Sequence, residues 1–292
     1  MTSKERMLAA LSRKQPDHLP ATTHHLMPYF LQKYMDGINN REFFDTFGLD
    51  PIEWPNFVAY TPDQLANWRI EKTEHPDKNG TLTRFRVITP KKTLTMSVTS
   101  NHYTAWVTEH LIKEKSDIEI LAAYMPAPHC EVEKQNAFYD AHPDALIRGT
   151  IVCADIYGQP GCWQDAACLF GIEPLILETY DDPEWVHAFL QILMQRKLTY
   201  VRSLEGSKFD LHELGGGDAS STVISPTIFD DFVAPYDAQI VQAAHDCGQK
   251  IVYHTCGGMM PILENIVSMG VDAIETLTPV GMGGDAVLWE AK

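Results

Sequence analysis

The chain has 292 residues, with 23 Lys and Arg against 39 Asp and Glu, so its formal net charge is −16. Hydrophobic residues make up 45% and charged residues 21%, which is typical of a folded globular protein. The acidic balance argues against binding to nucleic acid or to an anionic membrane, because both need clustered Lys and Arg. The sequence has no membrane-spanning apolar run, no signal-peptide pattern and no CxxC pair among its six cysteines. We therefore expect a cytoplasmic protein with reduced thiols.

The first hundred residues combine short helices with a run of hairpins. Their apolar spacing predicts helices over 4–11, 29–34 and 41–47 and a strand over 21–25. Thr, Val and Ile alternate between residues 68 and 100, around an Asn-Gly turn of the kind that closes tight hairpins. We therefore expect a β-meander at about residues 67–100, inserted into another architecture.

From about residue 115 onward, strands and helices alternate. The pattern predicts strands over 145–153, 209–214, 250–254 and 273–277, and helices over 183–204, 226–247 and 260–269. Pro183 and Pro226 mark helix starts, and Gly248 and Gly270 mark helix ends. This alternation indicates βαβ units and a parallel sheet.

The sharpest candidate for chemistry follows the strand at 250–254, where the sequence reads Tyr-His-Thr-Cys-Gly-Gly over 253–258. Residues two apart on a strand share a face, so His254 and Cys256 point the same way. Imidazole and thiolate are ligands that zinc favours, and a catalytic zinc site needs three protein ligands and an open position. Gly257 and Gly258 would let a substrate approach the backbone and leave a helix N-terminus open to an anion. A buried thiol beside a hydrogen-bonded histidine is the alternative that this pair leaves open.

Polar residues also end the strand at 209–214, where three glycines separate His212 and Glu213 from Asp218. Glu213 or His212 could supply a third metal ligand or an acid–base group, and Asp218 could bind a cationic or hydrogen-bond-donating group. A tight turn and a solvated loop are the structural alternatives. Glu275 lies in an otherwise apolar strand, so we expect its carboxylate to face a partner or a cavity.

Further candidates lie in loops that follow strands. Tyr157 begins a Tyr-Gly-Gln-Pro-Gly loop after the strand at 145–153 and could bind a cofactor. For His24 and His25, we expect an ordinary structural or surface role rather than a ligand role. Cys153 could bind a metal, but a small buried hydrophobe is the commoner role of such a cysteine.

Several segments, spread over nearly the whole chain, together match one known pattern. They are Lys4–Leu11, Pro16–Pro20, Ile224–Pro226 with Phe229 and Pro235-Tyr236, His254–Gly257 and Gly270–Glu275. In combination they resemble the uroporphyrinogen decarboxylase (URO-D) superfamily. The resemblance implies a (β/α)8 barrel with its active site at the carboxyl ends of the strands.

This superfamily divides by chemistry. The true decarboxylases carry an arginine-rich segment after the first strand, and residues 22–29 of this sequence contain no arginine. The other branch comprises cobamide-dependent methyltransferases, which hold zinc by an H-x-C pair and a further cysteine. His254 and Cys256 match that pair, so the resemblance is closer to this branch. It implies a zinc ion and a methylated corrinoid that arrives on a separate protein.

We predict an α/β chain whose residues 1–292 form a single URO-D-like domain. Its fold would be a TIM (β/α)8-type barrel that lacks the last two strand–helix units and carries the β-meander insertion. Six barrel strands are expected, near residues 21, 53, 147, 211, 252 and 275. No cysteine follows Cys256, so the third zinc ligand stays unassigned.

The predicted function is zinc-dependent methyl transfer between a methylated corrinoid (cobamide) and a thiol or similar acceptor. The expected site residues are Glu213, Asp218 and Glu275 for catalysis, Tyr157, Gly257 and Gly258 for a cofactor, and His254 and Cys256 for the metal. Expected partners are a small-molecule methyl donor or acceptor, a corrinoid protein and a second copy of the chain. Porphyrinogen decarboxylation is the alternative function, and an inactive barrel fragment that binds a ligand or partner is the second alternative.

Overall fold

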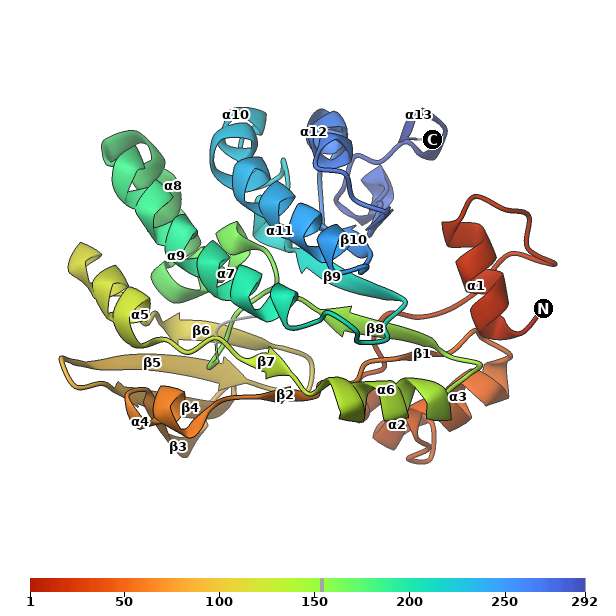
Figure 1. Ribbon diagram of the computed structural model, residues 1–292, viewed down its shortest axis with the longest axis horizontal. Helices are drawn as coiled ribbons and strands as arrows, with labels where there is room; N and C mark the ends of the chain where they lie inside the picture. The colour runs from red at the N-terminus through yellow and green to blue at the C-terminus, as the bar shows by residue number, and fades with distance from the viewer. Residues whose placement is uncertain (153–154, 292) are drawn as a thin grey trace.

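Two β-sheets and a short strand pair organise the computed structural model, which describes residues 1–152 and 155–291 (Figure 1). The larger structural unit is a five-stranded parallel sheet, with the strand order β1-β8-β9-β10-β11. Its strands are β1 (Ile52–Glu53), β8 (Leu146–Thr150), β9 (Leu211–Gly215), β10 (Ile251–His254) and β11 (Ala273–Glu275). Within the described ranges, β1 and β11 are the two edges of this sheet.

Helices follow β8, β9 and β10 and cover the outer side of the parallel sheet (Figure 1). The α-helices are α1 (Ser3–Leu11), α2 (Pro28–Tyr34), α3 (Asn40–Phe47), α4 (Pro62–Ala66), α5 (Ile118–Tyr124), α6 (Val132–Ala141), α7 (Cys162–Phe170), α8 (Ile172–Asp181), α9 (Pro183–Arg202), α10 (Pro226–Ile228), α11 (Ala234–Asp246), α12 (Leu263–Ser268) and α13 (Leu288–Ala291). A π-helical turn over 229–233 joins α10 to α11, so the helix predicted over 226–247 is continuous. Among the helices of the described residues, none is both long enough and apolar enough to cross a membrane.

The inner face of the parallel sheet carries an apolar layer and then a polar layer. The apolar layer packs Met7 of α1 against one residue from each of four strands, which are Ile52, Leu146, Leu211 and Val252. Two positions further along the chain, on the same face, come Trp54, Arg148, Glu213, His254 and, after Ala273, Glu275. The polar layer therefore lies toward the carboxyl ends of the strands, where TIM barrels carry their active sites.

The outer face of the same strands packs against the helices. Leu214 and Tyr253 are fully buried there in one hydrophobic core with Phe189 of α9 and Phe229 of the π-helical turn. This core packs against the outer face of the strands that carry the polar layer.

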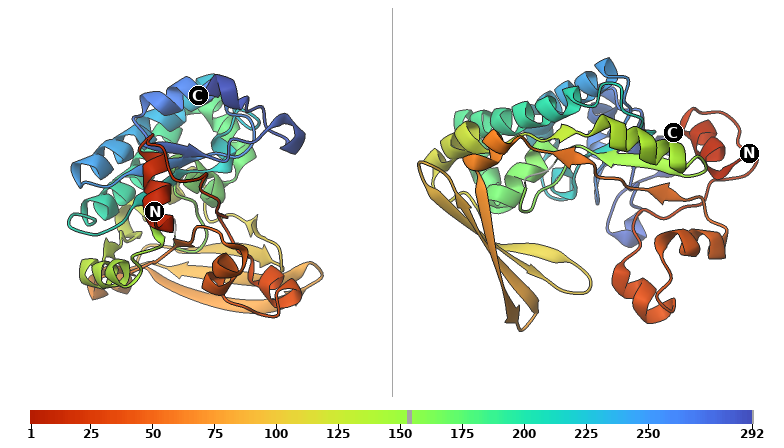
Figure 2. Two further views of the ribbon diagram at one scale, coloured as in Figure 1. Left: turned by 90° about the vertical axis from the view of Figure 1, so that its right-hand side faces the viewer. Right: turned by 60° about the horizontal axis from the view of Figure 1, so that its bottom comes forward.

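The predicted β-meander forms the second sheet. Its strands are antiparallel and consecutive, namely β3 (Arg69–Asp77), β4 (Gly80–Ile88), β5 (Thr93–Ser100) and β6 (Ala105–Glu109). Asp77 pairs with Gly80 across the predicted turn, and Gly80 has a φ of 141°, which a side chain would rarely allow. The sheet extends one strand beyond the predicted range, and Figure 2 shows it projecting from the parallel sheet. A separate antiparallel pair joins β2 (Val58–Ala59) to β7 (His129–Cys130).

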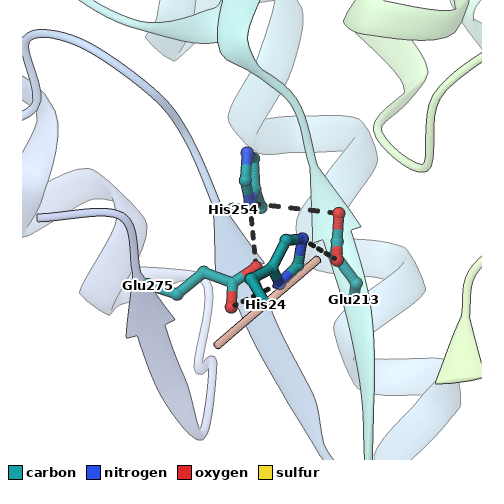
Figure 3. A group of neighbouring side chains, drawn as sticks. All are labelled: His24, Glu213, His254 and Glu275. Atoms are coloured by element: carbon teal, nitrogen blue, oxygen red, sulfur yellow. Dashed lines mark hydrogen bonds and ion pairs between the residues drawn. The ribbon is translucent and has the colours of Figure 1, made fainter. Parts of the chain in front are cut away.

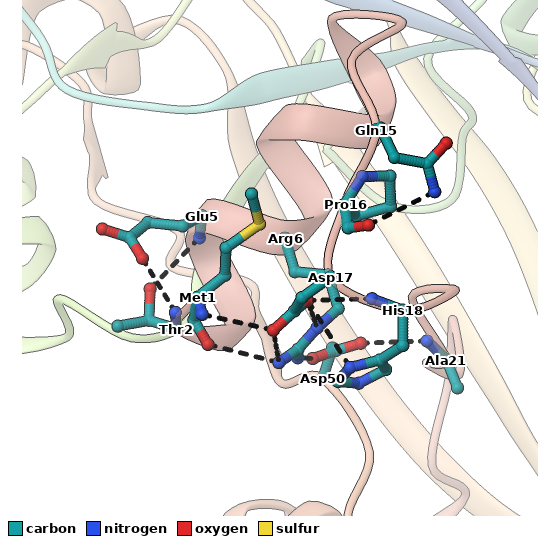
Figure 4. A network of polar contacts seen from close by, with 10 residues as sticks. All are labelled: Met1, Thr2, Glu5, Arg6, Gln15, Pro16, Asp17, His18, Ala21 and Asp50. Atoms are coloured by element: carbon teal, nitrogen blue, oxygen red, sulfur yellow. Dashed lines mark hydrogen bonds and ion pairs between the residues drawn. The ribbon is translucent and has the colours of Figure 1, made fainter.

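The predicted strand over 21–25 is wrong, because these residues have an irregular backbone. Side-chain contacts hold the segment in place instead (Figure 4). The Asp50 Oδ2 accepts a 2.9 Å hydrogen bond from the Ala21 amide, and the Asp50 amide donates to the Ala21 carbonyl at 2.7 Å. Arg6 of α1 binds both Asp50 and Asp17. The segment is thereby tied to the start of β1 and enters the polar layer without joining the sheet.

Candidate functional site

Four side chains of the inner polar layer gather at one point (Figure 3). They are Glu213 of β9, His254 of β10, Glu275 of β11 and His24 from the irregular segment before α2. Each offers one ligand atom, and these atoms all lie within 4.8 Å of one another, so the group could hold a metal ion. We call these four residues the carboxylate–histidine group.

The distances within the group are of two kinds. The Nδ1 of His254 is 2.8 Å from Glu275 Oε1, which is a hydrogen bond, and 3.9 Å from Glu213 Oε1. The two nitrogens of His24 lie 3.7 Å from Glu213 Oε2 and 3.8 Å from Glu275 Oε2. These last two separations are too long for hydrogen bonds, and the buried Nδ1 of His24 has no hydrogen-bond partner.

Arg148 of β8 binds both carboxylates of the group. Its Nη2 donates to Glu213 Oε2 at 2.9 Å and also to Glu275 Oε1. The side chain is only 5% exposed, and its guanidinium carbon lies 4.5 Å from the ring centroid of Trp54. The group therefore already contains a cation that the chain itself supplies.

Burial and contacts with neighbouring charged groups shift the pKa values of these side chains in opposite directions. Burial lowers the pKa of His254, but its contacts with Cys256, Glu275 and Glu213 outweigh burial and raise that pKa to about 10. Burial raises the pKa of Glu275, but hydrogen bonds from His254 and Arg148 outweigh it and lower that pKa to about 2. Burial lowers the pKa of His24 to about 4, although Glu275 opposes the change. Without a bound metal, these shifts favour a protonated His254, a neutral His24 and an ionised Glu275 at neutral pH, and a metal that binds His254 would have to displace a ring proton.

The second nitrogen of His254 faces a thiol, as the H-x-C spacing predicts. His254 Nε2 lies 3.1 Å from the Sγ of Cys256, and Cys256 is exposed. This arrangement fits zinc, because the donors are a nitrogen and a sulfur, and the other histidine nitrogen contacts a carboxylate. Metal-binding histidines usually have such a carboxylate partner, which here is Glu275.

A cavity of about 470 Å³ opens beside the carboxylate–histidine group. The aromatic residues His24, His25, Phe44 and Trp54 line it, together with polar groups that include Thr150, Gln159 and Glu213. Its described lining contains no Lys or Arg. A second cavity, of about 390 Å³, shares Trp54 and Thr150 with the first. Both cavities lie at the carboxyl ends of β1 and β8, where a substrate of a TIM barrel binds.

Two of the predicted site residues lie apart from this group. Asp218 accepts a 2.6 Å hydrogen bond from the Gln164 side chain, so its carboxylate is engaged with α7. The hydroxyl of Tyr157 donates to the carbonyl of Ala105 at 2.8 Å, which links the loop after β8 to the β-meander. Their predicted catalytic and cofactor roles remain predictions.

Gly257 and Gly258 lie in a crowded turn after Cys256. A Cβ on Gly257 would lie 2.6 Å from the hydroxyl of Thr222, and one on Gly258 would lie 2.4 Å from that of Ser221. The Gly258 amide donates to Thr222 at 2.6 Å, and Asp285 accepts from the next two amides of the chain. The amides of Gly258, Met259 and Met260 thus have partners within the chain, and the predicted cofactor role of the two glycines remains a prediction.

Sequence reasoning missed two members of the site. Arg148 was not among the candidates, and His24 was expected to have an ordinary structural or surface role. His212, a candidate third ligand, is fully buried and contacts Gln249 at 3.2 Å on the outer face of the sheet. Cys153 lies outside the described residues.

Comparison with known proteins extends the sequence evidence. Residues 158–283 match the uroporphyrinogen decarboxylase (URO-D) family. The resemblance to the URO-D superfamily is confirmed. The matched URO-D segment includes β9, β10 and β11 and therefore Glu213, His254, Cys256 and Glu275.

The URO-D-like fold also matches a solved structure, that of a methyltransferase from Methanosarcina mazei. The TM-score is 0.56 and the sequence identity 15%, over 94% of this chain and 75% of that one. At this identity the likeness supports the fold, and the predicted TIM-barrel type is confirmed. No curated protein matches the chain.

Proposed function

We propose that this chain is a zinc-dependent methyltransferase, which moves a methyl group between a methylated corrinoid and a thiol or similar acceptor. One observation carries the proposal. At the carboxyl end of β10, His254 Nε2 lies 3.1 Å from Cys256 Sγ, while His254 Nδ1 contacts Glu275 at 2.8 Å. The URO-D family match and the methyltransferase with a similar fold support the same reading.

In this proposal, His254 and Cys256 hold the zinc ion and Glu275 holds the imidazole in the orientation that binds it. Bound zinc would lower the pKa of a coordinated acceptor thiol until the thiol is a nucleophilic thiolate. Cys256 is exposed, so this position is open to an acceptor that enters from solvent.

The cavity of about 470 Å³ would receive the small substrate. Trp54, Phe44 and the ring of His25 would pack against the substrate, and Glu213 and Gln159 would offer polar contacts that orient it. A methylated corrinoid would supply the methyl group, and the acceptor thiol, having released its proton to water, would take that group on its sulfur. The corrinoid would arrive at the carboxyl end of the barrel on a separate protein.

Porphyrinogen decarboxylation has less support. A porphyrinogen carries several carboxylates, and such a substrate needs cationic side chains around it. The described lining of the 470 Å³ cavity has no Lys or Arg, and Arg148 is engaged with Glu213 and Glu275.

Metal analysis of the purified full chain tests the proposal. We expect one zinc per chain in the wild type and its loss in His254→Ala and in Cys256→Ser, with Asp218→Asn as a matched control that keeps its zinc. The same variants would be assayed for methyl transfer from methylcobalamin to a panel of small thiols. A wild type without zinc, or zinc that both site variants retain, would refute the metal assignment.

A further inference from the structure

His254 faces two different sets of donor atoms through its two ring nitrogens. Its Nε2 faces the sulfur of Cys256 at 3.1 Å, and its Nδ1 faces the carboxylates of Glu275 and Glu213 at 2.8 and 3.9 Å. With His24, the second set contains two imidazoles and two carboxylates. The same histidine therefore belongs to a nitrogen–sulfur pair and to a nitrogen–oxygen group.

These two sets favour different metals. A nitrogen–sulfur pair suits zinc, whereas two imidazoles with two carboxylates also suit harder divalent ions such as Mn²⁺. The orphaned Nδ1 of His24 and its spacing of 3.8 Å from Glu275 are compatible with an ion between them. The charges around the two sets should therefore determine which set binds a metal.

Arg148 contributes a positive charge beside one of these two sets. Its Nη2 contacts both Glu213 and Glu275, and the side chain is 5% exposed. A divalent ion that entered the carboxylate–histidine group would meet this fixed positive charge at close range, where little solvent screens the repulsion. The ion would also have to replace the guanidinium on the two carboxylates.

We propose that Arg148 is a selectivity residue, which fills the carboxylate–histidine group with a built-in cation and so confines metal binding to the His254–Cys256 side. Removal of the guanidinium charge would open a second divalent-ion site formed by His24, Glu213, His254 and Glu275. The wild-type half of this inference rests on the proposed zinc function, whereas the opening of the second site does not.

The experiment measures Mn²⁺ and Zn²⁺ binding to the full chain by calorimetry, with bound metal counted after dialysis. We expect Arg148→Gln to bind Mn²⁺ at least tenfold more tightly than the wild type. This new binding should survive Cys256→Ser and be lost in Glu213→Gln. Arg148→Lys keeps a positive charge and should gain no Mn²⁺ site. With Co²⁺ as the probe, the sulfur-to-metal absorption band should depend on Cys256 alone.

The inference is overturned if Arg148→Gln binds Mn²⁺ no better than the wild type, or if Arg148→Lys gains the same binding. If Arg148→Gln does not fold, single variants that retain Arg148 test the inference instead. His24→Ala and Glu213→Gln should then leave zinc affinity within about twofold, and a tenfold loss in either would overturn the inference. A wild type without zinc refutes the proposed function, yet a Mn²⁺ site gained in Arg148→Gln would still support the role of Arg148.

Discussion

Replacement of Glu275 by glutamine isolates the carboxylate that orients His254. Glu275 Oε1 accepts the 2.8 Å hydrogen bond of His254 Nδ1 and also binds Arg148. The introduced amide keeps the shape of the side chain but removes its charge, so the imidazole loses its ionic partner. Arg148 keeps its 2.9 Å contact with Glu213, so we expect the polar layer to stay folded.

The expected loss of zinc affinity follows from the position of Glu275, which contacts the proposed zinc ligand His254. Loss of a carboxylate partner from a metal-binding histidine typically weakens metal binding by about 10- to 100-fold, which is about 1.4–2.8 kcal/mol. Glu213 lies 3.9 Å from the same nitrogen and makes no hydrogen bond to it. Glu213→Gln should therefore change zinc affinity by no more than about twofold.

Zinc affinity would be measured by competition with a chromophoric chelator, for the wild type and for Glu275→Gln, Glu213→Gln and Asp218→Asn. Asp218 is the matched control, because its carboxylate contacts Gln164 and lies outside the carboxylate–histidine group. The reasoning fails if Glu275→Gln binds zinc as tightly as the wild type. It also fails if Asp218→Asn loses as much affinity, since the loss would then not depend on contact with His254.

Three other predictions concern a thiol, a buried carboxylate and a glycine. Cys256 is exposed, whereas Cys130, Cys162 and Cys168 are buried. Iodoacetamide should therefore label Cys256 first, and bound zinc should slow this labelling. Equal labelling rates with and without zinc would contradict the prediction. Burial raises the pKa of Asp117, but the contacts with Lys92 and two backbone amides outweigh it and lower that pKa. Asp117→Asn should therefore cost about 1–3 kcal/mol in urea unfolding at pH 7. This loss of unfolding free energy should become smaller as the pH falls from about 4 through the lowered pKa, because Asp117 then becomes protonated in the wild type. A free-energy difference between the two proteins that stays constant over this pH range would refute the prediction. Gly149→Ala would put a Cβ 2.4 Å from His212 Nδ1. We therefore expect this variant to be destabilised by about 1–3 kcal/mol and to have a lower melting temperature. An unchanged melting temperature would show that the His212 ring can move aside.

Much of the architecture is visible in the sequence because it rests on local patterns. The β-meander follows from alternation around an Asn-Gly turn, and α9 from a proline start and helical apolar spacing. Glu213 and His254 could be found because each is a polar residue near the end of a predicted strand, and Glu275 because it is a carboxylate within an otherwise apolar predicted strand. Helices α7 and α8 were not predicted, since α7 is buried nearly all round and shows no polar face.

The missed site residues depend on contacts that the sequence does not reveal. Arg148 stands in a short apolar run, and its role depends on carboxylates 65 and 127 residues away along the chain. His24 lies in a segment without regular structure, and its position is set by Arg6 and Asp50 around Ala21. No local pattern encodes such distant pairings.

The inner polar layer has a consequence for how the chain tolerates changes in length. Each of four strands carries its polar residue two positions after an apolar one, as in Leu146 and Arg148. One residue inserted into or deleted from β8 before Arg148 would exchange the two faces of the strand beyond that point. Arg148 would then point into the helix layer, and Ile147 or Gly149 would take its place in the polar layer. A single-codon insertion or deletion in these strands should therefore damage the site more than most single substitutions there.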